Sequence, residues 1–207
     1  GFIREWGQEQ YVRDIRITQI YEGTNGIQAL DLLGRKVVAN NGVWLNDFLD
    51  QVIAEAGCEL ALPLKTFGIQ LTEQAKVVVT LAHEVIRKAK QDPNAIGDSA
   101  TDFLHLLGLV TYAYLWLKMA DAAIKLQTKK SPNNTTLKNS ESEKIEQTSH
   151  VKQKAQTHGS IFSADFLQAK VHVCQYYFNR ELPKAGVFVK RIQAHSNDVM
   201  GMGDDLF

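Results

Sequence analysis

Two long series of apolar residues, spaced three or four apart, constrain the fold of this chain more than any other feature. The first series, between Pro63 and Pro93, consists of Phe67, Leu71, Ala75, Val78, Ala82, Val85 and Ala89. The second consists of Phe103, Leu106, Val110, Ala113, Leu117, Ala120 and Ile124. Because this spacing repeats with each helical turn, each series places its side chains on one helix face. The pattern predicts two long helices in a bundle, and Leu104, Leu107 and Tyr114 widen the apolar face of the second, which should lie deep inside.

Shorter helices are predicted before this pair. Residues 8–14 can form a short helix, and 15–24 have no sustained period, which predicts a loop. Asn25 can cap the next helix with Gln28 at its third position, and this helix should end near 40–42. Its predicted apolar stripe consists of Ile27, Leu30, Leu33 and Val37. A further helix is predicted over 43–56, ending at Gly57, which tolerates the left-handed conformation common after helix ends.

One linker and one more helix are predicted in the C-terminal part of the chain. The helix should bury an apolar stripe that consists of Phe162, Phe166, Ala169, Val173 and Tyr177. Pro183 should kink or interrupt it before apolar residues resume. Residues 128–159 are rich in Lys, Ser, Thr, Asn and Gln and hold no aromatic residue, so they predict a flexible linker. No segment alternates with strand period, and the predicted fold class is all-α, an up-and-down helical bundle.

Composition excludes several kinds of partner. Lys plus Arg and Asp plus Glu both number 23, so no overall field attracts nucleic acid or an anionic membrane. Residues 103–120 are apolar, but a membrane-spanning helix needs about 20 mostly apolar residues. This stretch is short and carries His105 and Lys118, which favours a buried bundle helix over a transmembrane span. Cys58 and Cys174 lie far apart in sequence and are predicted to be ordinary buried thiols.

No metal site is predicted. His83 and Glu84 begin like the zinc motif H-E-x-x-H, but Arg87 occupies the position of the second histidine ligand. The other histidines on predicted helices stand singly, with no second histidine at helical spacing, and they are predicted to be structural. These are His105, His172 and His195.

The run Tyr21-Glu22-Gly23-Thr24 stands before a predicted helix and allows two interpretations. In the first, Glu22 favours the helix N-terminus electrostatically while Gly23 permits a sharp turn. In the second, the carboxylate takes part in chemistry, because a loop carboxylate between an aromatic residue and a glycine can be desolvated and closely approached by a ligand. Spacing alone does not decide between them.

Residues 13–28, RDIRITQIYEGTNGIQ, resemble the R-D-x-x-I-x-x-I-Y-E-G-T-x-x-I-Q signature of acyl-CoA dehydrogenases. Gly1-Phe2 resembles the end of the family's preceding flavin-contacting loop, G-G-x-G-F, in register with Glu22. The close match covers about residues 1–40. Residues 43–207 more loosely resemble the helical extension of one subset, which contains the 3-methylthiopropionyl-CoA dehydrogenases. The resemblance therefore divides the chain into the end of a catalytic helical domain, 1–42, and a helical extension, 43–207.

The resemblance also implies roles for the residues of the loop. Glu22 would be the base that removes the substrate's α-proton, Gly23 would lie against the thioester, and Tyr21 would line the acyl pocket. Thr24, Asn25 and Gly26 match positions that contact the ADP portion of FAD. Many family members carry Gln at the position of Gly26, so only a backbone contact to the cofactor is expected there.

The implied activity is FAD-dependent oxidation of an acyl-CoA to a trans-2-enoyl-CoA, with electron-transfer flavoprotein as the electron acceptor. A homo-oligomer is expected, located in the cytoplasm of a bacterium or the mitochondrial matrix of a eukaryote. Two alternatives stay open. An acyl-CoA oxidase shares the base but reduces oxygen, and a non-catalytic helical module would serve only oligomerisation. The chain is interpreted as a fragment, because it starts within a patterned segment.

Overall fold

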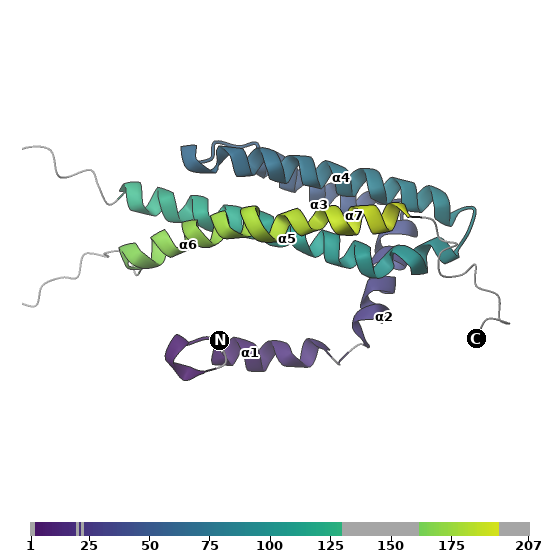
Figure 1. The fold of residues 1–207 in the computed structure, drawn as a ribbon, viewed down its shortest axis with the longest axis horizontal. Helices are drawn as coiled ribbons and strands as arrows, with labels where there is room; N and C mark the ends of the chain where they lie inside the picture. Colours follow the sequence, from purple (N-terminus) through teal and green to yellow (C-terminus); the bar gives the residue numbers. More distant parts are fainter. Residues whose placement is uncertain (1–2, 20, 22, 130–161, 195–207) are drawn as a thin grey trace, which may run out of the picture.

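The computed structural model of the chain describes residues 3–19, 21, 23–129 and 162–194. The secondary structure of these residues is helical, and no strand occurs among them, which confirms the all-α prediction (Figure 1). The main helices are α1 (Glu9–Arg16), α2 (Asn25–Leu30), α3 (Val43–Ala56), α4 (Lys65–Ala89), α5 (Asn94–Lys129), α6 (Ala164–Tyr176) and α7 (Ala185–Gln193). A π-helical segment, Asp31–Val38, continues α2.

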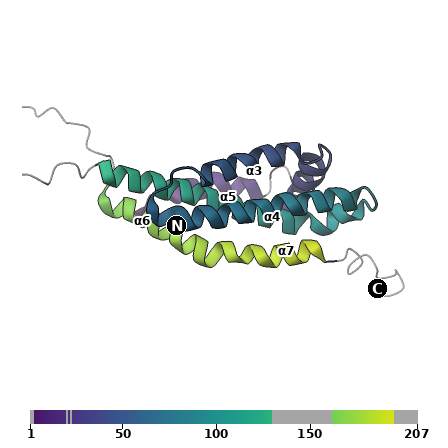
Figure 2. The same cartoon turned by 90° about the horizontal axis from the view of Figure 1, so that it is seen from above.

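Helix α5 is the centre of the bundle. Helices α3, α4, α6 and α7 all pack against it (Figures 1 and 2). The predicted apolar faces of α4 and α5 are buried in one core, in which Leu71, Val78, Phe103 and Val110 are completely inaccessible to solvent. The two long periodic series therefore predicted both helices and their buried faces correctly.

The predicted inward face of α6 is wrong. Phe162, Phe166 and Val173 are exposed, while the helix buries an apolar stripe offset from them in the helical wheel. The buried residues are Leu167, Val171 and Cys174, continued by Phe178 in the π-helical segment Tyr177–Glu181. Both stripes have helical spacing, so periodicity alone could not decide which of them faces α5.

Helix ends confirm the predictions in part. The turn before α3 contains Asn41 and Gly42 with φ of 55° and 80°, where the helix was expected to end. Thr24, rather than Asn25, stands at the N-cap of α2. Gly57 follows α3 as predicted, but its φ of −86° is right-handed and not left-handed. Pro183 interrupts the chain between α6 and α7 within a short 3₁₀ turn, Leu182–Lys184.

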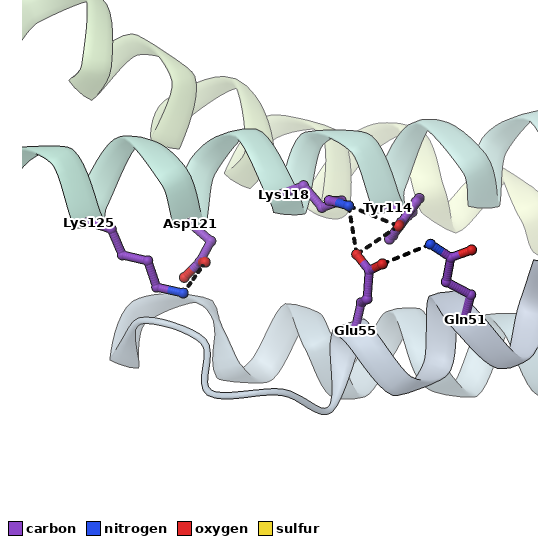
Figure 3. A network of polar contacts seen from close by, with 6 residues as sticks. All are labelled: Gln51, Glu55, Tyr114, Lys118, Asp121 and Lys125. Carbon is purple, nitrogen blue, oxygen red and sulfur yellow. Dashed lines mark hydrogen bonds and ion pairs between the residues drawn. The ribbon is translucent and has the colours of Figure 1, made fainter.

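Polar side chains join α3 to α5 on one flank of the bundle (Figure 3). Glu55 Oε2 accepts a hydrogen bond of 2.7 Å from the Tyr114 hydroxyl and lies 2.7 Å from Lys118 Nζ. Gln51 donates to the other oxygen of Glu55 at 2.9 Å. Further along α5, Asp121 accepts the backbone N–H of Ala61 at 3.0 Å. These contacts fix the end of α3 and the turn after it against α5.

The structure tests three further predictions only in part. The predicted linker, 128–159, lies outside the described residues from position 130 onward. Cys174 is buried as predicted, but Cys58 is exposed because it lies on the turn between α3 and α4. Within the described residues, the stretch Asn94–Thr128 is long and apolar enough to cross a membrane. A buried core helix can have the same length and apolar composition, and α5 is the central helix of this bundle. The length and composition of α5 therefore do not decide between the two, and the absence of a membrane span stays a prediction.

Candidate active-site loop

The candidate loop, residues 21–26, follows α1 and includes the first residues of α2, and its described residues lie outside the body of the bundle (Figure 1). Tyr21 donates its backbone N–H to the Ile17 carbonyl at 3.0 Å, and its side chain is about half exposed. Glu22, the predicted base, lies outside the described residues. The structure therefore describes the residues on either side of Glu22.

Gly23 has a backbone that favours glycine. Its φ is +106°, in the left-handed region that residues with a Cβ rarely adopt. A Cβ at this position would also lie 3.0 Å from Ile27 Cγ2. The sharp turn that the first interpretation assigned to Gly23 is thus present, whereas the electrostatic role that it assigned to Glu22 lies outside the described residues.

Thr24, Asn25 and Gly26 form the start of α2, and all three are exposed. The Thr24 carbonyl accepts the first helical hydrogen bond, from Gln28 N–H at 3.0 Å, and its hydroxyl makes no capping bond. The first N–H groups of a helix have no partner within the helix, so they can donate to a ligand. A Cβ at Gly26 would meet no atom closer than Thr24 Oγ1, at 3.9 Å. The space around this position therefore does not require glycine.

A cavity of about 500 Å³ lies beside α2 and its π-helical continuation, and residues between Ile27 and Lys36 line it. Its lining includes Asp31, whose carboxylate is 2.9 Å from both Arg35 Nη1 and Lys36 Nζ. The hydrogen bond from Lys36 lowers the pKa of Asp31. One carboxylate between two cations leaves an excess positive charge that suits an anionic group. This cluster was not predicted from the sequence, although the spacing of Asp31 and Arg35, four residues apart, was a usable signal.

His83 and His105, both set aside in the sequence, contact other parts of the bundle. His105 stacks on Phe188 with ring centroids 5.3 Å apart, and His83 Nε2 is 3.4 Å from the Asn46 side chain. His195 lies outside the described residues. In the part of the chain that the structure describes, no group of three or more His, Cys, Asp or Glu side chains could hold a metal ion.

Comparisons with known proteins agree with the resemblance seen in the motif. A 3-methylmercaptopropionyl-CoA dehydrogenase from Ruegeria pomeroyi is 38% identical over 111 residues, which are 52% of this chain and 19% of that protein. The broad-specificity linear acyl-CoA dehydrogenase FadE5 from Mycobacterium tuberculosis is 44% identical over 52 residues, which are 25% of this chain and 8% of that protein. The matched part of the chain thus covers about a fifth of the first relative and less than a tenth of the second.

The family model described as "Acetyl-CoA dehydrogenase C-terminal like" matches residues 45–203, from the beginning of α3 to beyond α7. This match covers most of the chain and all of the bundle helices from α3 onward. The chain therefore belongs to the acetyl-CoA dehydrogenase C-terminal-like family and is the C-terminal part of an acyl-CoA dehydrogenase-like protein.

Proposed function

We propose that the longer polypeptide to which this chain corresponds oxidises an acyl-CoA thioester to a trans-2-enoyl-CoA, with Glu22 removing the α-proton. The observation that carries the proposal is the segment 21–26, in which Tyr21, Thr24, Asn25 and Gly26 are exposed. Its Gly23 adopts a left-handed backbone beside the candidate base, in a chain that belongs to this family. The names of both relatives state acyl-CoA dehydrogenase activity, which supports the same substrate class.

The proposed oxidation requires a strong base in a desolvated site. An α-C–H bond of a thioester is a weak acid, so proton removal needs both a base and polarisation of the carbonyl by hydrogen-bond donors. A carboxylate covered by an acyl chain loses water, and desolvation raises its pKa, which makes it a stronger base. Tyr21 would line the acyl pocket beside Glu22, and Gly23 would let the thioester approach the backbone.

FAD would supply the hydride acceptor that no side chain provides. The residues assigned to it fit an anionic group, because Thr24, Asn25 and Gly26 are exposed at a helix start with a free capping hydroxyl. The excess positive charge at Arg35 and Lys36 lies further along the same helical segment. These residues would bind and orient the ADP portion of the cofactor.

Two rival functions make different demands. A dehydrogenase would pass electrons to electron-transfer flavoprotein, whereas an acyl-CoA oxidase would reduce oxygen. Turnover with an artificial electron acceptor and little hydrogen peroxide would support the dehydrogenase. A non-catalytic oligomerisation module would carry no flavin, so flavin absorbance in the purified longer polypeptide would exclude it. Homo-oligomerisation is compatible with all three and belongs to the proposal as an expectation.

The decisive variant is Glu22→Gln in the longer polypeptide. The amide nearly preserves the shape of the side chain but cannot accept the proton, and loss of a general base typically costs about 10²–10⁴ in rate. We expect flavin to remain bound while its bleaching by acyl-CoA in a single turnover is lost. The control is Glu5→Gln, since Glu5 is exposed and lies before α1. Near-normal bleaching in Glu22→Gln would remove this residue from the proposed role.

A further inference from the structure

The sequence contains two Asn-Gly pairs, and the fold places them in different surroundings. Asn25-Gly26 begins α2, in the candidate loop, and Asn41-Gly42 forms the turn before α3. An asparagine followed by glycine loses its side-chain amide readily, because glycine has no Cβ to hinder the approach of its nitrogen to the asparagine side chain. The surroundings of each glycine N–H therefore decide whether the pair reacts.

The Asn41-Gly42 pair is held in an arrangement that resists this reaction. Gly42 donates its N–H to the Val37 carbonyl at 2.8 Å and to Asn40 Oδ1 at 3.1 Å. Gly42 is also buried, and a Cβ built on it would lie 3.3 Å from Ile86 Cδ1. An N–H that is bonded to two acceptors and shielded from water gives up its proton slowly. Its nitrogen is therefore a poor nucleophile while the turn stays folded.

The Asn25-Gly26 pair lacks this protection. Both residues are exposed, and Gly26 is the second residue of α2. The N–H groups of a first helical turn have no partner within the helix, and the Thr24 hydroxyl makes no capping bond to them. A Cβ built on Gly26 would meet no atom closer than Thr24 Oγ1, at 3.9 Å, so the space around this backbone is open. Only the first turn of α2 has to open for the pair to react, and helix ends fray readily.

We propose that Asn25 is a deamidation site of this protein and that the fold protects Asn41 from the same reaction. The Gly26 nitrogen attacks Cγ of Asn25 and loses its proton to water. A new C–N bond closes a succinimide ring, the bond from Cγ to the side-chain nitrogen breaks, and ammonia leaves. Water then opens the ring at either carbonyl and leaves aspartate or isoaspartate. Water is the sole co-reactant, and nothing is oxidised or reduced.

Deamidation would have a consequence for cofactor binding, and this consequence alone rests on the proposed function. Asn25 is one of the three residues proposed to contact the ADP portion of FAD. A carboxylate at this position would repel the anionic phosphates of that portion. Isoaspartate would also add a methylene group to the main chain of the loop. Loss of the cofactor would leave Asn25 open to water, and its conversion would then oppose rebinding.

The test is peptide mass spectrometry of residues 1–207 after incubation at mildly alkaline pH, once folded and once in urea. Trypsin separates the two pairs, because it cleaves after Arg35 and Lys36. In the folded chain, Asn25 should be converted several-fold faster than Asn41. In urea the two rates should become similar, because Gly42 loses its hydrogen bonds. Equal rates in the folded chain would overturn the proposal, and so would an unchanged ratio in urea, which would assign the difference to neighbouring residues rather than to the fold.

A substitution tests the route of the reaction. The structure accommodates a Cβ at Gly26, so Gly26→Ala should keep the fold while hindering attack by the backbone nitrogen. We expect this variant to slow the conversion of Asn25 several-fold and to leave that of Asn41 unchanged. An unchanged rate at Asn25 would contradict the proposed ring closure.

The consequence for the cofactor is tested with Asn25→Asp in the longer polypeptide. Asn94→Asp is the matched control, since Asn94 is also exposed and is the first residue of a helix, α5. Flavin absorbance after purification should fall several-fold in Asn25→Asp and stay at the parent level in Asn94→Asp. Equal flavin content in both variants would overturn the consequence. A parent without flavin would instead contradict the proposed function, and the rates measured at Asn25 and Asn41 would still decide the deamidation.

Discussion

At the scale of single residues, Glu55 shows how a partly exposed carboxylate can make stability depend on pH. Hydrogen bonds, first from Lys118 and then from Gln51 and Tyr114, lower its pKa from 4.5 to about 2. A carboxyl whose pKa is lower in the folded state stabilises that state while it is ionised. The stabilisation by the ionised Glu55 carboxylate is fully present above pH 4.5, the ordinary pKa of this group, and it is lost as the pH falls toward 2.

The variant Glu55→Gln should therefore melt at a lower temperature than the parent at neutral pH. The difference should shrink between pH 4.5 and 2, because the parent loses the same charge there. Thermal melting followed by circular dichroism across this range checks the prediction. Glu73→Gln serves as the control, since Glu73 is an exposed glutamate of α4. A pH-independent difference would show that the charge of Glu55 does not contribute.

Gly68 illustrates a second single-residue constraint, set by the backbone. A Cβ at this position would lie 2.5 Å from the Ala56 carbonyl oxygen, which is fixed at the end of α3. Gly68→Ala should therefore lower the melting temperature by forcing α3 and α4 apart. At Gly108, within α5, a Cβ meets no atom within 4 Å, so Gly108→Ala should stabilise residues 1–207 by about 0.5–1 kcal/mol. Calorimetric melting of both variants tests this opposite pair, and equal shifts would contradict it.

At the scale of elements, α5 should tolerate a charge on one side and not on the other. Leu117 is 2% exposed and Leu115 is 44% exposed, only two residues apart. Burying a leucine side chain is worth about 1.5–3 kcal/mol, and an unpaired buried carboxylate adds its own cost. Leu117→Asp should unfold residues 1–207, whereas Leu115→Asp should leave their melting temperature almost unchanged. Unchanged melting of Leu117→Asp would mean that the packing of α5 described here is wrong.

Elements with one apolar stripe could be predicted from the sequence, and those with two could not. The series in α4 and α5 located both helices and their buried faces. In α6, Phe166 and Leu167 belong to competing stripes of similar spacing, and contact with α5 selects Leu167. The exposure of Tyr112 and Leu115 on α5 could not be predicted either, because these residues have the same apolar character as the core residues of the helix. Tertiary packing decides such cases, and periodicity contains no information about it.

The candidate loop shows a different limit. Its motif was visible as YEGT, and the glycine turn that it predicted is present at Gly23. The cation cluster at Arg35 and Lys36 became evident only when the continued helix placed both beside Asp31. The division of the chain at residue 42 stays a prediction. In the structure, Leu33 and Val37 share one core with α3 and α5, so the loop is joined to the bundle through a packed helical segment.

At the scale of the whole molecule, residues 1–207 by themselves should bind FAD weakly or not at all. Sites for ligands of this size are concave and bury about 70–90% of the ligand surface. The residues assigned to the cofactor, Thr24, Asn25 and Gly26, are exposed, and the lining of the adjacent cavity includes the charged residues Asp31, Arg35 and Lys36. The relatives are at least about five times longer than the part that this chain matches, so most of a flavin site could lie in the remaining sequence. Isothermal titration of residues 1–207 with FAD should give no micromolar affinity, while the longer polypeptide should retain flavin absorbance after purification. Micromolar binding to residues 1–207 would show that the loop and the cavity beside it already form a cofactor site.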